Sequence, residues 1–191
     1  MPPWILSQRW HDLLFAHWPL PAAELRAAVP PALSLETCEG SAWISVVALR
    51  MSGIRFRRMP PVPGLSAFRE LNVRTYVTGP AGPGVWFLSL DAGSRAAVAV
   101  ARRWFRLPYY RARLLSEVDG EGFSYRSRRT HRGAPPAEFA AWYAPAGPKR
   151  TAAPGSLDHW LVERYALYAA DPEGRPLAAR IAHEPWPLQT A

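Results

Sequence analysis

Hydrophobic and polar residues alternate with a period of two in several stretches of the chain, which is the pattern of β-strands. The clearest example is residues 68–77. One face of this stretch is apolar, whereas the other carries Glu70, Asn72, Arg74 and Tyr76. The apolar face has to lie in a core, so the pattern predicts a strand packed on at least one side.

Other stretches predict further strands and a few short helices. Strands are expected at residues 4–18, 42–50, 85–90, 107–117, 122–129, 138–144, 165–169 and 177–183. Helices are expected at residues 21–29, 95–105 and 156–164, with Asp91 or Ser94 capping the second and Ser156 the third. Loops are expected at 52–66, 130–137 and 145–155. This order predicts an α+β fold dominated by strands, as a curved sheet or barrel.

Composition narrows the class of protein. A length of 191 residues favours a single domain over residues 1–191, and 49% hydrophobic residues are enough for a sizeable core. The only cysteine, Cys38, excludes a disulfide framework and a multi-thiolate metal site. The N-terminal residues contain no signal-peptide core, and no apolar run is long enough to span a membrane. We therefore expect a cytoplasmic protein without membrane contact.

The charge of +8 comes almost entirely from arginine, because Lys149 is the only lysine among 23 basic residues. A GC-rich coding bias explains this composition without any function. A need for planar guanidinium groups that bind carboxylate or phosphate is the functional alternative. Nucleic-acid binding is a third interpretation, but the arginines are spread along the chain. Lys149 lies in the expected loop 145–155, so lysine imine chemistry inside the domain is not expected.

The polar face of residues 68–77 is the first candidate site. A carboxylate (Glu70), an amide (Asn72) and a guanidinium (Arg74) on one face would suit a small polar ligand if this face lined a cavity. If the strand is an outer one, the same residues meet water. The strand pattern alone favours the water-facing interpretation.

Tyrosine, arginine and histidine residues give the remaining candidates. Tyr110 and Arg111 lie on opposite faces of the strand that follows Pro108. A packing role for Tyr110 competes with a role as hydrogen-bond donor or weak acid. His17 and His183 lie beside Trp and Pro residues, where a structural role is favoured. No histidine pair has metal-ligand spacing, and no nucleophile elbow or glycine-rich nucleotide loop is present, so no metal or cofactor is expected.

Five separated blocks of the sequence occur in an order that resembles the YqjF-like family of uncharacterised bacterial proteins. These blocks are residues 14–19, 63–76, 84–92, 107–112 and 183–188. The resemblance covers nearly the whole chain. More distantly, the family resembles the acetoacetate decarboxylase superfamily, which implies a curved, cone-shaped β-barrel with a few flanking helices around a central pocket.

The resemblance also implies a departure in mechanism. In the decarboxylases a strand glutamate precedes a segment whose lysine forms a Schiff base. Glu70 corresponds to that glutamate by order and spacing, and Tyr109 and Tyr110 stand where the lysines stand. A phenol cannot form an imine. The pocket is therefore expected without the decarboxylase reaction, and this expectation shifts Glu70, Asn72 and Arg74 toward the interior.

Three hypotheses for function follow. In the first, Glu70 is a catalytic acid or base and Tyr110 a catalytic hydrogen-bond donor acting on a small keto or enol acid. The predicted substrate-binding residues are Asn72, Arg74, Tyr109, Arg111, His17 and His183. In the second, the same pocket only binds a small molecule. In the third, the basic residues 126–129 bind nucleic acid, which the spread of charge disfavours. The sequence leaves open whether the protein self-associates into a homo-oligomer.

Overall fold

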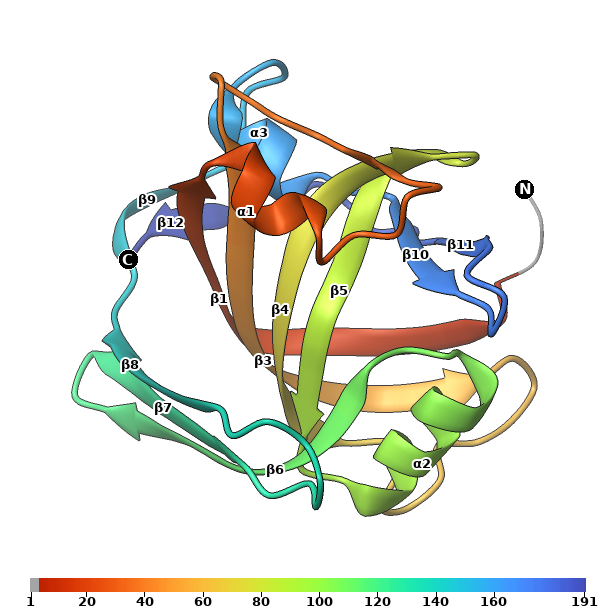
Figure 1. The fold of residues 1–191 in the computed structure, drawn as a ribbon. Helices are drawn as coiled ribbons and strands as arrows, with labels where there is room; N and C mark the ends of the chain where they lie inside the picture. The colour runs from red at the N-terminus through yellow and green to blue at the C-terminus, as the bar shows by residue number, and fades with distance from the viewer. Residues whose placement is uncertain (1–3) are drawn as a thin grey trace. The chain divides into compact units, whose positions relative to one another are not determined.

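The structure, a computed structural model, describes residues 4–191 and consists mainly of β-strands (Figure 1). Residues 1–3, which begin both the predicted domain and the segment without a signal-peptide core, lie outside the described residues. The elements are β1 (Leu6–Leu20), α1 (Ala22–Arg26), β2 (Ser34–Leu35), β3 (Ala42–Phe56), β4 (Phe68–Gly79), β5 (Gly82–Ala92), α2 (Arg95–Trp104), β6 (Tyr109–Asp119), β7 (Gly122–Arg129), β8 (Glu138–Tyr143), β9 (Ala146–Arg150), α3 (Leu157–Val162), β10 (Ala166–Ala170), β11 (Pro176–Arg180) and β12 (Leu188–Thr190).

Most strands are hydrogen-bonded in one sheet. Its order is β1-β3-β4-β5-β6-β7-β8, with β10 paired to both β5 and β11, and β2 paired to β4. Strands β9 and β12 form a separate two-stranded sheet. The predicted dominance of strands over a few short helices is confirmed.

The chain forms two compact units, each built from three separated segments. Among the described residues, unit 1 comprises residues 4–14, 47–72 and 90–143, and unit 2 comprises residues 15–46, 73–89 and 144–191. The sequence-based division into one domain over residues 1–191 stays a prediction.

Unit 1 contains the antiparallel strands β6, β7 and β8 and the helix α2 (Figure 1). Strand β6 also pairs in parallel with the end of β5, where Leu90 lies opposite Tyr109. A parallel pair needs a crossover connection, and α2 provides it. The hydroxyl of Ser94 accepts a hydrogen bond from the backbone N–H of Ala97, which confirms Ser94 as the helix cap.

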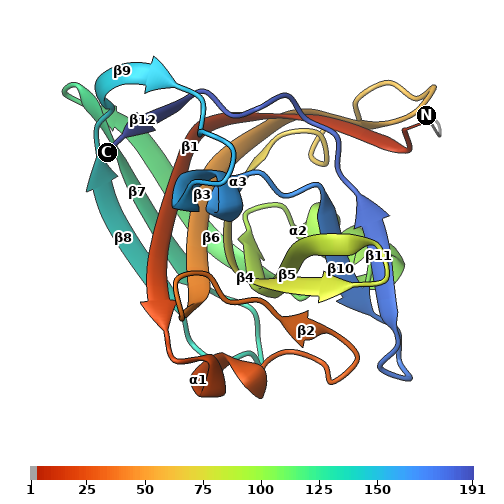
Figure 2. The same cartoon turned by 90° about the horizontal axis from the view of Figure 1, so that it is seen from above.

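Unit 2 contains α1, β2, α3 and the C-terminal hairpin of β10 and β11 (Figure 2). Ser156 caps α3 by accepting a hydrogen bond from the N–H of His159, as predicted. Two apolar clusters form its core. Their most buried members are Val29, Leu33, Val77, Ala166 and Tyr168 in one cluster, and Tyr76, Val85, Ala152, Leu161 and Val162 in the other.

Two predicted loops are partly wrong. Strand β3 continues to Phe56, into the expected loop 52–66, with Gly53 at a positive φ of 62°. Strand β9 lies inside the expected loop 145–155. Its proline is tolerated because β9 pairs only with β12, so one edge of β9 needs no backbone donor. Prolines and glycines had suggested loops where the chain uses a kinked strand and an edge strand.

Among residues 4–191, no helix is long and apolar enough to cross a membrane.

A substitution at Gly84 tests how closely β5 and β10 approach each other within unit 2. A Cβ at this position would lie 2.6 Å from the carbonyl oxygen of Ala166, which belongs to a paired strand and cannot move aside easily. We expect Gly84→Ala to lower the free energy of unfolding by about 1–3 kcal/mol, measured by urea denaturation. Gly93→Ala is the control, because its Cβ would meet nothing closer than 3.8 Å. Equal stability of both variants and the wild type would contradict the close approach.

Candidate functional site

The carboxyl of Glu70 lies inside unit 1, and only 4% of the residue is exposed. Its Oε2 accepts a hydrogen bond of 2.5 Å from the hydroxyl of Tyr109, and its Oε1 accepts one of 3.3 Å from Nδ2 of Asn72. The hydroxyl of Tyr125 donates to the backbone oxygen of Glu70 at 2.8 Å. Side chains from β4 and β6 therefore hold this carboxyl, and a side chain from β7 holds the backbone of the same residue.

Burial dominates the electrostatics of Glu70. It raises the pKa of the carboxyl to about 7, against the hydrogen bonds from Tyr109 and Asn72, which lower it. No basic side chain among residues 4–191 lies within ion-pair distance of this carboxyl to restore a low pKa. Burial and the charge of Glu70 raise the pKa of Tyr109, so this phenol stays protonated and keeps donating. A carboxyl with this pKa can both release and take up a proton near neutral pH.

The polar face of β4 is buried, so the water-facing interpretation is wrong for these residues. Asn72 is 3% exposed and Arg74 is 6% exposed. Glu70 and Asn72 belong to unit 1, whereas Arg74 belongs to unit 2. Both faces of β4 are covered, and the period of two in the sequence could not reveal this.

The two tyrosines at the start of β6 have different surroundings. The hydroxyl of Tyr109 reaches Glu70, whereas no hydrogen bond joins the hydroxyl of Tyr110 to Glu70. The ring of Tyr110 packs against the guanidinium of Arg129, 4.2 Å from the ring centroid, and edge-on against His131. Tyr109, predicted as a binding residue, therefore holds the position next to the carboxyl that was expected for Tyr110.

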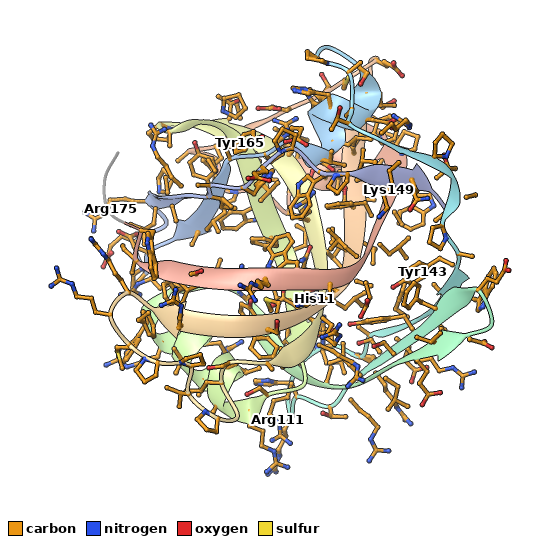
Figure 3. The ribbon with its side chains drawn as sticks, turned by 180° about the vertical axis from the view of Figure 1, so that it is seen from behind. His11, Arg111, Tyr143, Lys149, Tyr165 and Arg175 are labelled. Carbon is orange, nitrogen blue, oxygen red and sulfur yellow. The ribbon has the colours of Figure 1, made fainter. Side chains whose placement is uncertain are left out.

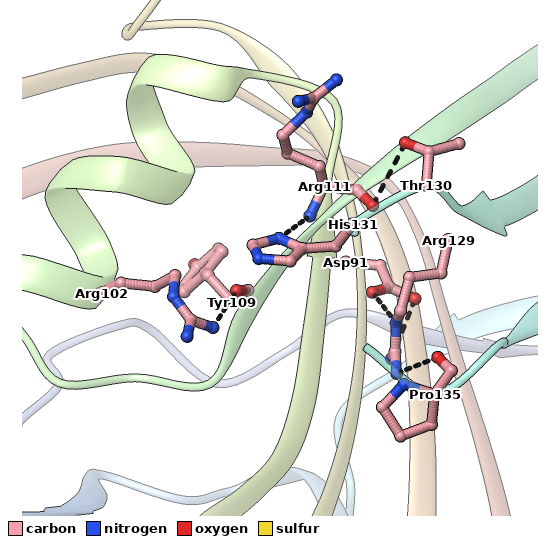
Figure 4. A network of polar contacts seen from close by, with 8 residues as sticks. All are labelled: Asp91, Arg102, Tyr109, Arg111, Arg129, Thr130, His131 and Pro135. Atoms are coloured by element: carbon pink, nitrogen blue, oxygen red, sulfur yellow. Dashed lines mark hydrogen bonds and ion pairs between the residues drawn. The ribbon is translucent and has the colours of Figure 1, made fainter. Parts of the chain in front are cut away.

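A buried ion pair supports this part of unit 1 (Figure 4). Nε of Arg129 donates to Oδ1 of Asp91 at 2.7 Å, and Nη2 donates to Oδ2 at 3.2 Å, with both side chains under 10% exposed. The same guanidinium covers the ring of Tyr110. Sequence reasoning missed this pair. The alternation of β7 could have found it, because Arg126 and Arg128 face outward and Arg129 shares the opposite face with Ser127.

The placement of Arg111 does not support a role beside Glu70. Its backbone N–H donates to Nδ1 of His131 at 3.1 Å, and its backbone oxygen accepts from Thr130. Its side chain extends away from Tyr109 and Asp91 (Figure 4). Arg111 as an anion-binding residue remains a prediction.

The two predicted histidines belong to unit 2. Nδ1 of His17 is hydrogen-bonded to the hydroxyls of Ser45 (2.6 Å) and Tyr76 (3.2 Å), and burial together with the charge of Arg74 lowers the pKa of His17 to about 4. His183 is packed between Tyr165 and Trp186, with ring centroids 4.4 and 4.7 Å away. His17 lies in a buried polar network, whereas His183 lies in an aromatic stack.

Three buried oxygen atoms of unit 1 lack hydrogen-bond partners among the described residues. They are Oγ of Ser66, Oδ1 of Asn72 and Oγ of Ser127. A buried polar atom without a partner costs about 1–3 kcal/mol, so a ligand or water there would relieve a real penalty. No group of three His, Cys, Asp or Glu residues within residues 4–191 is arranged to hold a metal ion.

An open groove of about 610 Å³ lies elsewhere on unit 1, beside the start of α2. Phe68 and Arg69 contribute to its lining, together with Ser94, Arg95 and Arg113. Glu70, Asn72 and Tyr109 do not line it. The chemistry of the buried carboxyl and the groove are therefore separate features of unit 1.

Comparison with known proteins identifies a matching family. The DUF2071 family model, described as "Uncharacterized conserved protein (COG2071)", matches residues 7–191. A Bacillus subtilis protein described as "Uncharacterized protein YqjF" is 46% identical over 188 residues, which make up 98% of this chain and 76% of that protein. The predicted resemblance to YqjF-like proteins is confirmed.

Solved structures give the fold. The acetoacetate decarboxylase of Legionella pneumophila matches with a TM-score of 0.54 and 14% identity, over 92% of this chain and 64% of that chain. The enduracididine biosynthesis enzyme MppR, complexed with pyruvate, matches with a TM-score of 0.57 and 14% identity, over 93% of this chain and 68% of that chain. The predicted acetoacetate decarboxylase-like fold is confirmed, and at this identity the likeness extends to the fold alone.

The raised pKa of Glu70 makes stability depend on pH. The folded protein holds the proton up to about pH 7, whereas the unfolded chain releases it near 4.5, so folding stability falls as pH rises through this window. Between pH 5 and 8, Glu70 is expected to lower the free energy of unfolding by about 2–3 kcal/mol. The side chain of Glu70→Gln stays neutral, so this fall should be missing when urea unfolding of the variant is measured at both pH values.

The control for this measurement is Glu138→Gln. Glu138 is 71% exposed and pairs with Arg128 on the surface of unit 1. Its replacement should leave the pH dependence of the wild type in place. Parallel pH profiles for the wild type and Glu70→Gln would show that Glu70 is ionised in the folded protein throughout this range.

Proposed function

Because the chain belongs to the DUF2071 family and has an acetoacetate decarboxylase-like fold, we propose that it is an enzyme acting on a small keto or enol acid by acid–base chemistry at Glu70. No covalent bond to the protein is part of this reaction. The observation that carries the proposal is the buried carboxyl of Glu70, whose pKa lies at about 7. Perturbed carboxyls of this kind are concentrated at functional sites.

The proposal excludes an imine intermediate. An imine needs a lysine amine, and the only lysine of the chain is Lys149. Lys149 is exposed on β9 in unit 2 (Figure 3). The reaction that a lysine performs in the decarboxylases is therefore not carried over to this chain.

The proposed reaction is a proton transfer next to a carbonyl group. The carboxylate of Glu70 takes a proton from the carbon beside the ketone and the electron pair moves to the carbonyl oxygen, which gives an enolate. The protonated carboxyl then gives a proton to the enolate oxygen, which yields the enol, or to the carbon, which restores the ketone. Tyr109 stabilises the carboxylate form of Glu70 before the transfer, and the free Oδ1 of Asn72 can accept a hydrogen bond from an enol hydroxyl.

The substrate class rests on analogy. Acetoacetate and pyruvate, the molecules named for the structural neighbours, are both keto acids. Roles in substrate binding for Asn72, Tyr109 and Arg111 of unit 1 belong to the proposal, as does a catalytic role for Tyr110. Substrate-binding roles for Arg74, His17 and His183, which belong to unit 2, stay predictions. Cytoplasmic location, self-association and the absence of nucleic-acid binding remain predictions.

A non-catalytic binding module is the second candidate. The partnerless oxygens of Asn72 and Ser127 favour it, because they would suit a bound molecule whether or not it reacts. In this case a keto acid would stabilise the protein and be recovered chemically unchanged. Hydrogen exchange on keto acids in D2O separates the two candidates.

Hydrogen exchange on keto acids tests the catalytic role of Glu70. In D2O, the wild type should accelerate deuterium incorporation at C3 of at least one acid of a panel containing pyruvate and 2-oxobutyrate, followed by proton NMR. Glu70→Gln should lower the accelerated rate by about 100-fold or more, because the proton acceptor is lost. Glu138→Gln should exchange like the wild type. Stabilisation by an acid that gains no deuterium would support the binding module instead.

A comparison of Tyr109→Phe with Tyr110→Phe tests which tyrosine serves Glu70. The hydrogen bond from Tyr109 lowers the pKa of Glu70, so its removal should raise this pKa further. The exchange rate rises with pH as Glu70 loses its proton, so this rise should occur at higher pH in Tyr109→Phe. Tyr110→Phe should leave the pH of this rise unchanged, because the hydroxyl of Tyr110 makes no hydrogen bond to Glu70. A shift in Tyr110→Phe alone would reverse the assignment.

A further inference from the structure

Unit 2 buries two arginine side chains around one tyrosine ring. Arg74 on β4 and Arg164 after α3 are each 6% exposed. Their guanidinium carbons lie 6.0 and 4.9 Å from the ring centroid of Tyr76. Two like charges in an apolar interior repel each other and are costly unless negative charge accompanies them.

Only one of these two arginines has a carboxylate partner. Nη1 of Arg164 donates to Oε2 of Glu36 at 2.8 Å, and its Nε donates to the backbone oxygen of Trp160 at 2.7 Å. Nη2 of Arg74 donates to the backbone oxygen of Leu161 at 3.3 Å. Within residues 4–191, no carboxylate lies at ion-pair distance from Arg74. Arg74 is therefore a buried guanidinium of unit 2 without a carboxylate partner.

Neighbouring titratable groups of unit 2 do not supply a carboxylate for Arg74. The buried carboxylate of Glu163 accepts hydrogen bonds from the hydroxyl of Tyr165 and the backbone N–H of Trp186 instead. His17, beside Tyr76, is neutral near pH 7 because its pKa is lowered to about 4. Asp158, which also acts on His17, is half-exposed and already paired with Arg150 at 2.6 Å. Burial lowers the pKa of Arg74 and the charge of Arg164 adds to this, although Tyr76 opposes it.

Each guanidinium also has a nitrogen without a hydrogen-bond acceptor. Nε of Arg74 and Nη2 of Arg164 are both buried and lack partners among the described residues. A buried donor on a charged group without an acceptor costs more free energy than a neutral one. The protein keeps both donors in an enclosed aromatic environment, which suggests that an anion completes them.

We propose that unit 2 contains a binding site for a small monocarboxylate, in which Nε of Arg74 and Nη2 of Arg164 donate hydrogen bonds to the ligand. Guanidinium groups match the planar geometry of a carboxylate. A monocarboxylate supplies the single negative partner that Arg74 lacks, whereas phosphate brings a larger negative charge. Aromatic rings of Phe15, Tyr76 and Trp160 surround the two arginines and suit a short apolar body on the ligand.

The site does not depend on acid–base chemistry at Glu70. Its arginines and aromatic rings belong to unit 2, and binding can be measured without turnover. If proton transfer at Glu70 fails its test, carboxylate binding at Arg74 remains measurable. If carboxylate binding at Arg74 fails its test, proton transfer at Glu70 remains measurable.

Calorimetric titration of the full chain tests the proposal with pyruvate and propionate as probes. Methyl pyruvate and inorganic phosphate serve as comparison ligands. At least one monocarboxylate should bind more tightly than its neutral ester and than phosphate. Arg74→Met should weaken that binding by about 30-fold or more, because a buried, hydrogen-bonded charge pair is broken. Arg74→Lys should retain part of the affinity, since the charge remains without the planar group.

Arg175→Met is the matched control. Arg175 is 74% exposed in unit 2 and pairs with Asp171 and Glu173, so its loss should not change carboxylate binding (Figure 3). Equal affinity in Arg74→Met and the wild type would overturn the proposal. Tighter binding of phosphate than of every monocarboxylate would overturn the class of ligand.

Stability distinguishes a ligand-binding arginine from a structural one. If Arg74 serves an absent anion, Arg74→Met removes an uncompensated charge and should keep or raise the urea midpoint without ligand. A large fall in the midpoint together with no carboxylate binding by the wild type would indicate a structural role. If Arg74→Met does not fold, 15N NMR of the wild type replaces it, with the Nε resonance of Arg74 identified by its absence in Arg74→Lys. Pyruvate should shift this resonance, and an unchanged resonance at saturating pyruvate would contradict the site.

Discussion

The unpaired carboxyl of Glu70 inside unit 1 is the constraint on which the rest of this unit depends. A charged carboxylate without a cation is strongly disfavoured in an apolar interior, so the group needs donors or a proton. Tyr109 and Asn72 provide donors, and the raised pKa provides the proton at neutral pH. The start of β6 must lie next to β4 for this to work, and Tyr125 secures β7 on the backbone of the same residue.

The crossover through α2 explains how Tyr109 comes to that position. Strands β5 and β6 run in parallel, with Leu90 opposite Tyr109, and α2 returns the chain between them. Arg102 near the end of α2 donates to the backbone oxygen of Tyr109 at 2.8 Å. Helix, turn and strand together hold the phenol on the carboxyl, so the local geometry of the site follows from the connection between two strands.

Local signals in the sequence predicted most elements, but not which faces are buried. Serine caps marked the starts of α2 and α3, and alternation marked β4 and β7, because both signals act between neighbouring residues. Glu70 and Asn72 looked suited to a water-facing surface, and only the resemblance placed them inside. Distant segments of the chain decide whether a second layer covers a strand, and a period of two in the strand carries no information about them.

The choice between Tyr109 and Tyr110 shows the same limit at the level of one residue. Both phenols are adjacent in sequence, and the resemblance identified the segment rather than the side chain. The hydrogen bond of Tyr109 to Glu70 and the packing of Tyr110 on Arg129 follow from the strand pairing. The pairing places Arg129 opposite Ala112, two residues beyond Tyr110, and Arg129 in turn needs the distant Asp91.

Two buried ion pairs of the described residues contrast with two buried groups that lack a partner of opposite charge. Asp91 with Arg129 and Glu36 with Arg164 are paired at 2.7 and 2.8 Å, and each pair holds its own unit together. Glu70 in unit 1 and Arg74 in unit 2 are buried without a partner of opposite charge, although apolar residues of similar size would fill the same space at lower cost in stability. A fold that retains such groups gives up stability for an interaction that the protein alone does not complete. For Glu70 the component that we propose is a proton that can be exchanged, and for Arg74 it is a carboxylate that can be bound.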